Sequence, residues 1–241
     1  MIQQALILAG GLGTRLGSVT KDVPKPMVAV GSKPFLEWLM LHISRQGIRH
    51  FVLCTGYLSE TIQNHFGDGR AFGWKIEYSV EEELLGTGGA IQKAFPLLHE
   101  HFLVLSGDNY LEMDYNGFFQ RFSNRKCTGM LSCWPNDPPL FKRNVKLDLD
   151  SSRILDYNFH TDEDKNYVDV GVKLFSQRLM DYFPARKKFS LEIDVMPHIA
   201  KDKGLYGYPV EKPPLDIGTP EGLEAVRKTL AENSQNTERS L

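Results

Sequence analysis

Apolar positions in the first half of the chain alternate between two kinds of spacing. Four short segments are rich in apolar residues and have the length of buried strands: 4–9, 51–54, 75–80 and 102–105. Between them, apolar residues recur every three or four positions, which predicts three helices, at 34–47, 58–66 and 86–98. Strands that alternate with helices in this way predict an α/β fold built on a parallel sheet.

The second half, residues 113–231, has a different pattern. It predicts a mostly helical stretch at 176–202, helices at 114–126 and 220–231, the last capped by Thr219, and strands at 128–134, 144–149, 153–160, 167–175 and 205–209. No linker separates it from residues 1–112, so we expect one domain over 1–231 with a Rossmann-like, mixed but mostly parallel sheet flanked by helices. We expect the second half to fold partly over the sheet as a lid subdomain, and the polar residues 232–241 to form a frayed tail.

Composition limits the classes of function. The 241 residues are 41% hydrophobic, as in globular proteins, and the formal net charge of −2 argues against a general binder of nucleic acid or anionic membranes. The three cysteines are too few for a disulfide framework and form no CxxC pair for zinc. Apolar segments are shorter than the ~20 residues of a membrane helix, and the N-terminus lacks the pattern of a signal peptide. We therefore expect a cytoplasmic protein with no nucleic-acid or membrane partner.

A glycine-rich loop follows the first strand. It carries Gly10, Gly11 and Gly13, then Arg15, and continues to Pro24-Lys25-Pro26. Glycines let the backbone approach a ligand closely, and backbone N–H groups beside two cations suit a polyanion such as phosphate. The flanking prolines restrict the backbone at Lys25, so this lysine has little entropy left to lose on binding. The loop lacks the third glycine of a dinucleotide fingerprint and the GxxxxGK[ST] of a P-loop. We interpret it as a different kind of nucleoside triphosphate loop.

Polar residues also follow the other predicted strands of the first half. In an open α/β sheet, ligands bind beyond the carboxyl ends of the strands. Asp108 comes just after the strand 102–105, and Asp216 stands in a similar context before the last helix. Mg²⁺ is usually held by one or two carboxylates together with substrate phosphates. The sequence thus predicts Mg²⁺ as the cofactor, held by Asp108 and Asp216 above the glycine loop.

Together these motifs resemble the sugar-1-phosphate nucleotidyltransferases, also called NDP-sugar pyrophosphorylases. The resemblance rests on segments in the family's order: Leu8–Leu16 with Pro24–Pro26, Leu85–Ala90, Gly107-Asp108, Ser190–Pro197 and Asp216–Pro220. It implies the nucleotide-diphospho-sugar transferase fold, with 1–112 as the nucleotide-binding half and 113–231 as the sugar-binding half. The implied partners are an NTP and a sugar 1-phosphate, and the implied reaction transfers a nucleotidyl group and releases pyrophosphate. A sugar phosphate is already a nucleophile at neutral pH, so cations that position two polyanions suffice.

The resemblance also implies roles for individual residues. Arg15 and Lys25 would be catalytic, with Arg15 on the β- and γ-phosphates and Lys25 between the α-phosphate and the sugar phosphate. Asp108 and Asp216 would hold Mg²⁺. The nucleotide would contact Leu8, Gly10, Gly11, Gly13, Thr14, Glu83 and Gly88. The sugar would contact Asn109, Gly171, Lys173 and Glu192.

The chain departs from the family's pattern in one place. Many members carry a lysine before the strand that leads to the sugar-contacting glycine, whereas this chain has Asp156–His160 there. Either Lys165 or Lys173 replaces that lysine, or the sugar phosphate relies on Lys25 alone, and the sequence leaves these alternatives open.

Weaker signals concern the base and the sugar. A carboxylate within Glu81–Glu83 can accept hydrogen bonds from the N1–H and N2–H₂ groups of guanine, which favours GTP. This acidic run, the chain length and the segment Asp216–Gly222 most resemble bacterial guanylyltransferases that act on D-glycero-α-D-manno-heptose 1-phosphate. The alternatives are guanylyl-, uridylyl- or cytidylyltransferases for mannose or glucose 1-phosphate, a glycosyltransferase of similar architecture, and a non-catalytic nucleotide-sugar sensor. The oligomeric state, a homo-oligomer included, stays open.

Overall fold

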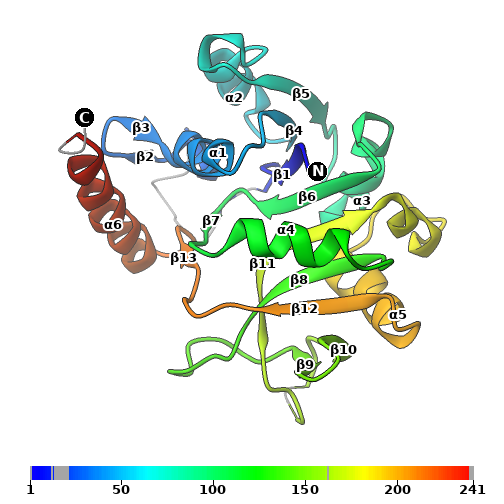
Figure 1. Cartoon of the computed structure of the whole chain (residues 1–241). Helices are drawn as coiled ribbons and strands as arrows, with labels where there is room; N and C mark the ends of the chain where they lie inside the picture. The colour runs from blue at the N-terminus through cyan, green and yellow to red at the C-terminus, as the bar shows by residue number, and fades with distance from the viewer. Residues whose placement is uncertain (1, 12, 14–21, 162, 239–241) are drawn as a thin grey trace.

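The computed structural model of the chain describes residues 2–11, 13, 22–161 and 163–238, and its largest element is a nine-stranded sheet (Figure 1). The strands of this sheet are β1 (Gln4–Leu8), β4 (His50–Thr55), β5 (Lys75–Val80), β6 (His101–Ser106), β8 (Gly129–Trp134), β9 (Val145–Asp148), β10 (Arg153–Tyr157), β11 (Val168–Ser176) and β12 (Leu205–Pro209). Two small ladders stand apart from it, formed by β2 (Ala29–Val30) with β3 (Lys33–Pro34) and by β7 (Asn109–Tyr110) with β13 (Leu215–Asp216).

The strand order across the large sheet is β5-β4-β1-β6-β11-β8-β12-β10-β9. The first four strands in this order are parallel, and β12 is parallel to β8. Antiparallel pairs appear where β11 meets β6 and β8, and where β10 meets β12 and β9. The predicted mixed, Rossmann-like sheet is therefore confirmed. Because strands of the second half continue the sheet beyond β6, much of that half stands beside the first half rather than over its face (Figure 1).

Helices flank the sheet, as predicted. They are α1 (Phe35–Arg45), α2 (Ser59–Phe66), α3 (Gly86–Ala94), α4 (Tyr115–Ser123), α5 (Met196–Lys201) and α6 (Pro220–Glu238). Turns of 3-10 helix lie at Lys25–Met27, Arg70–Phe72, Phe95–Leu97 and Gln177–Tyr182, and a π-helical turn lies at Leu191–Val195. Within the described part of the chain, no helix combines the length and apolar character needed to cross a membrane.

Two helical predictions are corrected by the structure. The stretch 176–202 divides into a 3-10 turn, an irregular segment, a π-helical turn and the short helix α5, because the irregular segment is held against α3 and tertiary contact outweighs local propensity. The last helix begins as predicted, and Thr219 Oγ1 accepts a hydrogen bond from Gly222 N–H at 3.1 Å as its N-cap. It runs on to Glu238, past the expected end at 231, since no glycine or proline interrupts it after Gly222.

Alternate side chains of the strands enter two apolar clusters, one on each face of the sheet. On β1, Ala5 and Ile7 belong to the cluster with α1, α2, α4 and α6, whereas Leu6 belongs to the cluster with α3 and α5. Strands buried on both faces have continuous apolar sequences, which explains the unbroken apolar run in residues 5–9. Both clusters draw residues from each half of the chain.

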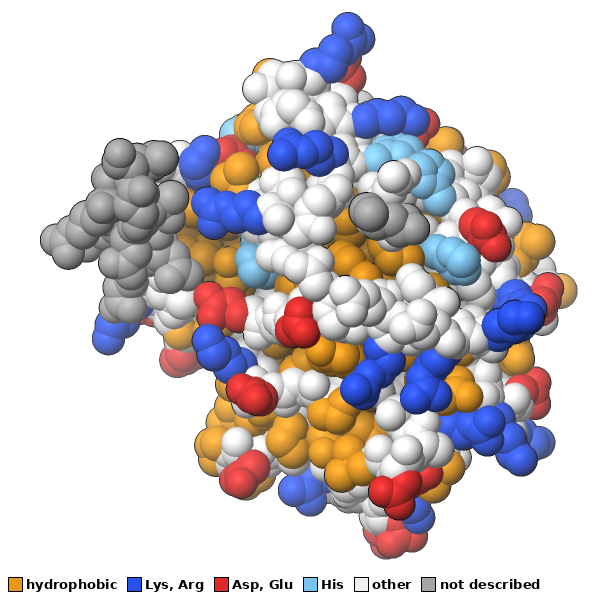
Figure 2. Space-filling view, in the orientation of Figure 1, with side chains coloured by type: hydrophobic (Ala, Val, Ile, Leu, Met, Phe, Trp, Pro, Cys, Tyr) orange, Lys and Arg blue, Asp and Glu red, His pale blue; other side chains and the backbone are white. Residues whose placement is uncertain are grey.

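The surface is mixed in character. On the face in Figure 2, Lys and Arg side chains are interspersed with Asp and Glu, and apolar side chains gather over the lower part. Among the described residues, Leu149 and Leu155, next to β9 and within β10, are 59% and 55% exposed. This interspersed pattern agrees with the formal net charge of −2.

The start of α3 is held by the segment that precedes the π-helical turn. The Gly88 and Gly89 N–H groups donate to Phe189 O at 3.1 and 3.3 Å, and Phe189 N–H donates to Leu85 O at 2.9 Å. A Cβ on Gly88 would overlap the Phe189 ring, and one on Gly89 would overlap the carbonyl oxygen of Lys187. Packing between two segments therefore requires these glycines, whatever ligand lies nearby.

The substitution Gly89→Ala tests this packing. Alanine gains about 1 kcal/mol over glycine in a helix interior, but here its Cβ meets a backbone oxygen, and overpacking costs about 1–3 kcal/mol. We expect a net loss of stability, measured as a lower Tm by circular dichroism. Gly11→Ala is the control, since an added Cβ there meets no described atom within 4 Å. An unchanged Tm for Gly89→Ala would show that the backbone at Lys187 is not held against α3.

Candidate functional site

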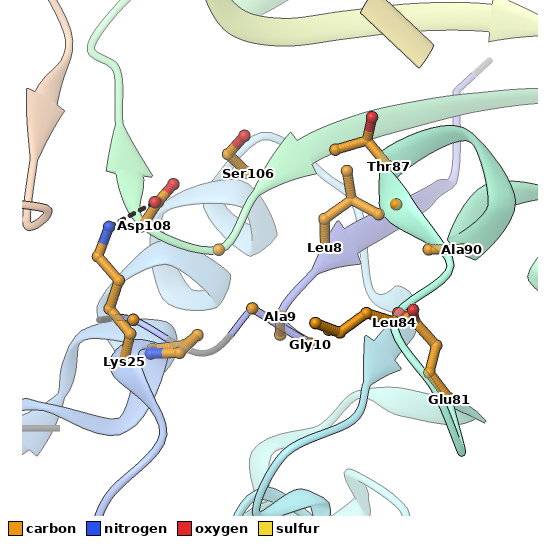
Figure 3. A pocket seen from close by; sticks show the side chains of 15 residues that line it. Leu8, Ala9, Gly10, Lys25, Glu81, Leu84, Thr87, Ala90, Ser106 and Asp108 are labelled. Atoms are coloured by element: carbon orange, nitrogen blue, oxygen red, sulfur yellow. Dashed lines mark hydrogen bonds and ion pairs between the residues drawn. The ribbon is translucent and has the colours of Figure 1, made fainter. Parts of the chain in front are cut away.

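A cavity of about 360 Å³ opens at the carboxyl ends of β1 and β6 (Figure 3). Its walls are the loop after β1, Ser106 to Asp108 after β6, Glu81 after β5, and Thr87 at the start of α3. This is the edge at which open α/β sheets bind ligands. The predicted site residues that line it are Leu8, Gly10, Gly11, Gly13, Lys25 and Asp108.

Close packing explains the glycines at the entrance to this cavity. Gly107 N–H donates to Leu8 O at 2.9 Å, and a Cβ on Gly107 would stand 2.7 Å from that oxygen. On the other side, a Cβ on Gly10 would stand 2.9 Å from Glu81 Oε1. A Cβ on Gly107 would therefore meet the backbone of β1, whereas one on Gly10 would require the Glu81 side chain to shift. The backbone after β1 forms part of the cavity wall.

Lys25 is the central charge of the site. It lies in the 3-10 turn after Pro24, and only 7% of its surface is exposed. Its Nζ lies 2.5 Å from Asp108 Oδ2 and 3.7 Å from Asp216 Oδ1 (Figure 3 shows the Asp108 contact). One ammonium group thus lies between two carboxylates from distant parts of the chain. The structure brings together three residues that the sequence singled out.

A two-stranded ladder places the second carboxylate. β13 pairs antiparallel with β7, with Asp216 opposite Asn109, and Ile217 N–H donates to Asp108 O at 3.0 Å. Gly218 N–H donates to Asp216 Oδ1 at 2.6 Å and so fixes one carboxylate oxygen. Backbone hydrogen bonds therefore hold the two aspartates side by side.

This pair of carboxylates fits Mg²⁺. Asp108 and Asp216 already share one positive charge, and carboxylate oxygens are ligands that Mg²⁺ prefers. Among the described residues, no group of three or more His, Cys, Asp or Glu side chains is arranged to hold a metal ion. Mg²⁺ at this pair would therefore need oxygens from a ligand, such as phosphate, to complete its shell.

Beyond Asp108 the site continues into β11. Gly171 has a φ of +90°, and a Cβ there would stand 2.9 Å from Asn109 Nδ2. Gly171 N–H donates to Asp169 Oδ1 at 3.0 Å. Two residues predicted on the sugar side, Asn109 and Gly171, therefore lie next to each other, and Asn109 directly follows Asp108 in the chain.

Glu192 is fixed from one side by hydroxyl groups. Its Oε2 accepts hydrogen bonds from Thr87 Oγ1 at 2.5 Å and from Ser190 Oγ at 3.1 Å. Thr87 Oγ1 in turn accepts from Leu191 N–H at 2.9 Å. Because Thr87 also lines the cavity, a single hydroxyl group connects the cavity wall to the predicted sugar carboxylate.

Lys173 is a buried cation held by carboxylates. Its Nζ lies 3.0 Å from Asp169 Oδ2 and 3.8 Å from Glu192 Oε1. Burial lowers the pKa of Lys173, but the Asp169 and Glu192 carboxylates raise that pKa by more, so the lysine stays charged. Tyr157 OH donates to Asp169 Oδ2 at 2.8 Å, and burial together with this carboxylate raises the pKa of Tyr157.

Lys165, another candidate for the missing family lysine, pairs elsewhere. Its side chain is 4% exposed, and its Nζ lies 2.5 Å from Asp156 Oδ2 and donates to Glu163 O at 3.2 Å. Of the two buried lysines, Lys173 is the one in contact with Glu192.

Other predicted residues lie apart from the cavity wall. Glu83 is exposed, and Glu81, the first residue of the acidic run, is the one that lines the cavity. Gly88 lies beneath the wall, against Phe189. Thr14 and Arg15 lie outside the described residues, so their predicted contacts stay predictions.

The sequence reasoning missed several groups of the site. Thr87 lies within the Leu85–Ala90 motif, so attention to its hydroxyl could have found it. Asp169 and Tyr157 carry no local signal, because they meet only through an irregularity in β11.

Comparison with known proteins decides the family. The model of a family described as Nucleotidyl transferase matches residues 4–233. The chain belongs to this nucleotidyl transferase family. Its resemblance to sugar-1-phosphate nucleotidyltransferases is confirmed by relatives of that kind.

Individual relatives cover most of the chain. It is 33% identical to a D-glycero-alpha-D-manno-heptose 1-phosphate guanylyltransferase of Aneurinibacillus thermoaerophilus over 228 residues, 94% of this chain and 98% of the relative. It is 34% identical to the protein of the same name from Campylobacter jejuni over 190 residues, 78% and 83% of the two chains. The structure resembles HddC from Yersinia pseudotuberculosis complexed with GMP-PN, with a TM-score of 0.78 and 29% identity, covering 95% of this chain and 100% of that one.

Glu81, at the wall of this nucleotidyltransferase cavity, makes the stability of the protein depend on pH. Burial raises the pKa of Glu81, although its Oε2 accepts a hydrogen bond from Leu85 N–H at 3.0 Å. A carboxyl group whose pKa is higher in the folded state binds more protons there than in the unfolded chain. Its contribution to stability therefore grows as the pH falls through the folded pKa, and it is unfavourable at neutral pH.

Glu81→Gln keeps a hydrogen-bond acceptor and removes the charge. We expect the variant to have a higher Tm than the wild type at pH 7, and the difference to shrink as the pH falls toward about 4, where carboxyl groups protonate. Thermal denaturation at several pH values measures this. Glu83→Gln, at an exposed carboxylate, is the control and should show no such trend. A Tm difference for Glu81→Gln that does not vary with pH would contradict the desolvation of this group.

Proposed function

We propose that the protein is a guanylyltransferase that joins GTP to a sugar 1-phosphate and releases pyrophosphate, with D-glycero-α-D-manno-heptose 1-phosphate as the preferred sugar. The observation that carries the proposal is the nearly buried Lys25 ammonium at the cavity, between Asp108 and Asp216. The heptose 1-phosphate guanylyltransferases at 33% and 34% identity, and the structural similarity to HddC complexed with GMP-PN, support this base and sugar.

The reaction needs charge and position more than it needs a base. An oxygen of the sugar phosphate attacks the α-phosphorus of GTP, a P–O bond forms, and the bond to the α,β-bridging oxygen breaks as pyrophosphate leaves. All the reacting groups are anionic, so cations that hold them in line lower the barrier. Lys25 would place its charge between the two phosphates that react. The backbone at Gly10 and Gly11, together with Arg15, would hold the β- and γ-phosphates.

Asp108 and Asp216 would hold Mg²⁺ in the working enzyme. The ion would supply positive charge to the phosphate oxygens as pyrophosphate forms. Lys25 would then exchange its carboxylate partners for phosphate oxygens. In this structure, the Lys25 ammonium group offsets one of the two carboxylate charges.

The base and the sugar would lie on opposite sides of this centre. Glu81, at the cavity wall, is better placed than Glu83 to accept hydrogen bonds from the N1–H and N2–H₂ groups of guanine. Glu192 and the backbone at Gly171 would contact the sugar, beside Asn109. We also propose a cytoplasmic location, which fits the buried, free Cys54, Cys127 and Cys133.

Pyrophosphate release is the direct test of this function. The protein is assayed with GTP, ATP, UTP and CTP, each paired with D-glycero-α-D-manno-heptose, mannose and glucose 1-phosphates. We expect GTP with the heptose to have the highest kcat/KM, by about tenfold over mannose 1-phosphate, because hydrogen-bonding groups that the smaller sugar leaves unpaired carry a penalty. No release with any pair would refute the enzyme, and a preference for another NTP would refute the assignment of the base.

Variants at the charged centre test its parts separately. Lys25→Met and Asp108→Asn should each lower kcat about 100-fold or more, the scale for a group that stabilises transition-state charge. The affinity for Mn²⁺ without nucleotide, measured by electron paramagnetic resonance, should change in opposite directions in the two variants. Lys25→Met should bind Mn²⁺ more tightly, by about tenfold for 1.4 kcal/mol, since two carboxylates lose their cation, whereas Asp108→Asn should bind it more weakly. Equal Mn²⁺ affinity in Lys25→Met and the wild type would contradict competition between lysine and metal.

A further inference from the structure

β11 carries an irregularity beside the site. Asp169 lies opposite Cys133 on β8 and Lys173 lies opposite Leu131, so four steps along β11 match two steps along β8. β11 therefore contains a bulge of two extra residues. In a regular strand the Cα atoms of Asp169 and Lys173 would lie about 13 Å apart. With the bulge, Asp169 and Lys173 occupy the positions of two residues that stand two apart in a regular strand, on the same face. Lys173 Nζ lies 3.0 Å from Asp169 Oδ2.

Asp169 closes this bulge. Its Oδ1 accepts from Gly171 N–H at 3.0 Å, and Gly171 has the positive φ that residues with a Cβ rarely adopt. Its Oδ2 holds both Lys173 Nζ and Tyr157 OH. Asp169 N–H donates to Asn144 Oδ1 at 2.9 Å, so both the backbone and the side chain of Asp169 are fixed.

The bulge directs Lys173 toward Glu192. Two hydroxyl groups, those of Thr87 and Ser190, already occupy Glu192 Oε2. Oε1 faces Lys173 Nζ at 3.8 Å, and the Glu192 side chain is 21% exposed, against 6% for Lys173. The Glu192 side chain is therefore partly exposed, whereas Lys173 is buried behind it.

We propose that Asp169 and Lys173 are positioning residues, which act through the bulge of β11 to orient Glu192 toward the hydroxyl groups of the sugar 1-phosphate. Lys173 does not bind the phosphate of that sugar. The inference rests on the proposed function for the nature of the ligand, a polyhydroxylated sugar that bears a 1-phosphate. Its hydroxyl groups donate to the Glu192 carboxylate, whose direction the buried pair sets.

Lys173→Met tests the role of the lysine against a matched control. We expect the KM for the sugar 1-phosphate to rise about tenfold and the KM for GTP to change less than about twofold. Misdirecting one charge-assisted hydrogen bond weakens binding of its ligand by about this factor. Lys165→Met is the control, because Lys165 is equally buried and pairs with Asp156 outside the Asp169–Lys173–Glu192 cluster. It should leave the sugar KM unchanged and lower the Tm by less than Lys173→Met does, because the side chain of Asp156 is 49% exposed and that of Asp169 only 3%.

A double-mutant cycle shows whether Lys173 acts through Glu192. In a Glu192→Gln background, Lys173→Met should raise the sugar KM by less than about twofold, because effects that pass through one group are not additive. Asp169→Asn keeps an acceptor for Gly171 N–H and loses the charge that holds Lys173. It should raise the sugar KM by less than Lys173→Met does.

Other outcomes would overturn the inference. Full additivity in the cycle would mean that Lys173 contacts the ligand directly. Equal changes in both KM values would mean a structural role alone. Failure of the proposed function is seen separately, as a wild type that releases no pyrophosphate. In that case calorimetric binding of the sugar 1-phosphate to the same variants decides: affinity that falls with Lys173→Met supports the inference, and equal or undetectable affinity refutes it.

Discussion

One nearly buried ammonium group determines how the rest of this site is arranged. Removing a lysine from water costs several kcal/mol, about as much as pairing with a carboxylate returns, so a buried lysine needs close anionic partners. Lys25 has two, at 2.5 and 3.7 Å. Two neighbouring carboxylates would in turn repel each other without a cation. The fold must therefore bring the turn at Lys25, the end of β6 and the strand β13 to one point. Phosphates that bind there would meet charged side chains that are already in place.

Backbone contacts satisfy this requirement. Gly107 lies against the Leu8 carbonyl oxygen at the end of β1, where a Cβ would have no room. The ladder of β7 and β13 then sets Asp216 beside Asn109, so the second carboxylate does not depend on a flexible side chain for its place. Preorganisation of this kind lets charges stabilise a developing anion without moving at the moment of reaction.

The sequence predicted the helices and strands whose apolar residues recur at a regular spacing. Buried strands and amphipathic helices are local patterns, and the rule that ligands bind at carboxyl ends of parallel strands placed the glycine loop and Asp108 at one edge of the sheet. Asp216 was added from its similar sequence context and from the family resemblance. The sequence reasoning named Glu83 as the nucleotide contact, whereas Glu81 lines the cavity, because neighbouring residues after a strand point in different directions that depend on the loop. It also treated residues 176–202 as mostly helical, since their contact with α3 is tertiary. The bulge at Gly171 escaped entirely, as a positive φ leaves no mark in the sequence beyond a glycine.

That bulge bears on the lysine that many family members carry and this chain lacks. Three lysines were candidates to meet the sugar phosphate. Lys165 is paired with Asp156, and Lys173 is held by Asp169 behind Glu192, so neither presents a free ammonium group to the cavity. Lys25 is the one of the three that lines the cavity. If a single lysine serves both reacting phosphates, its release from Asp108 and Asp216 becomes a condition for binding the second substrate. The irregular strand and the shared ammonium group then belong to one arrangement, in which β11 orients the sugar and Lys25 alone supplies the lysine charge at its phosphate.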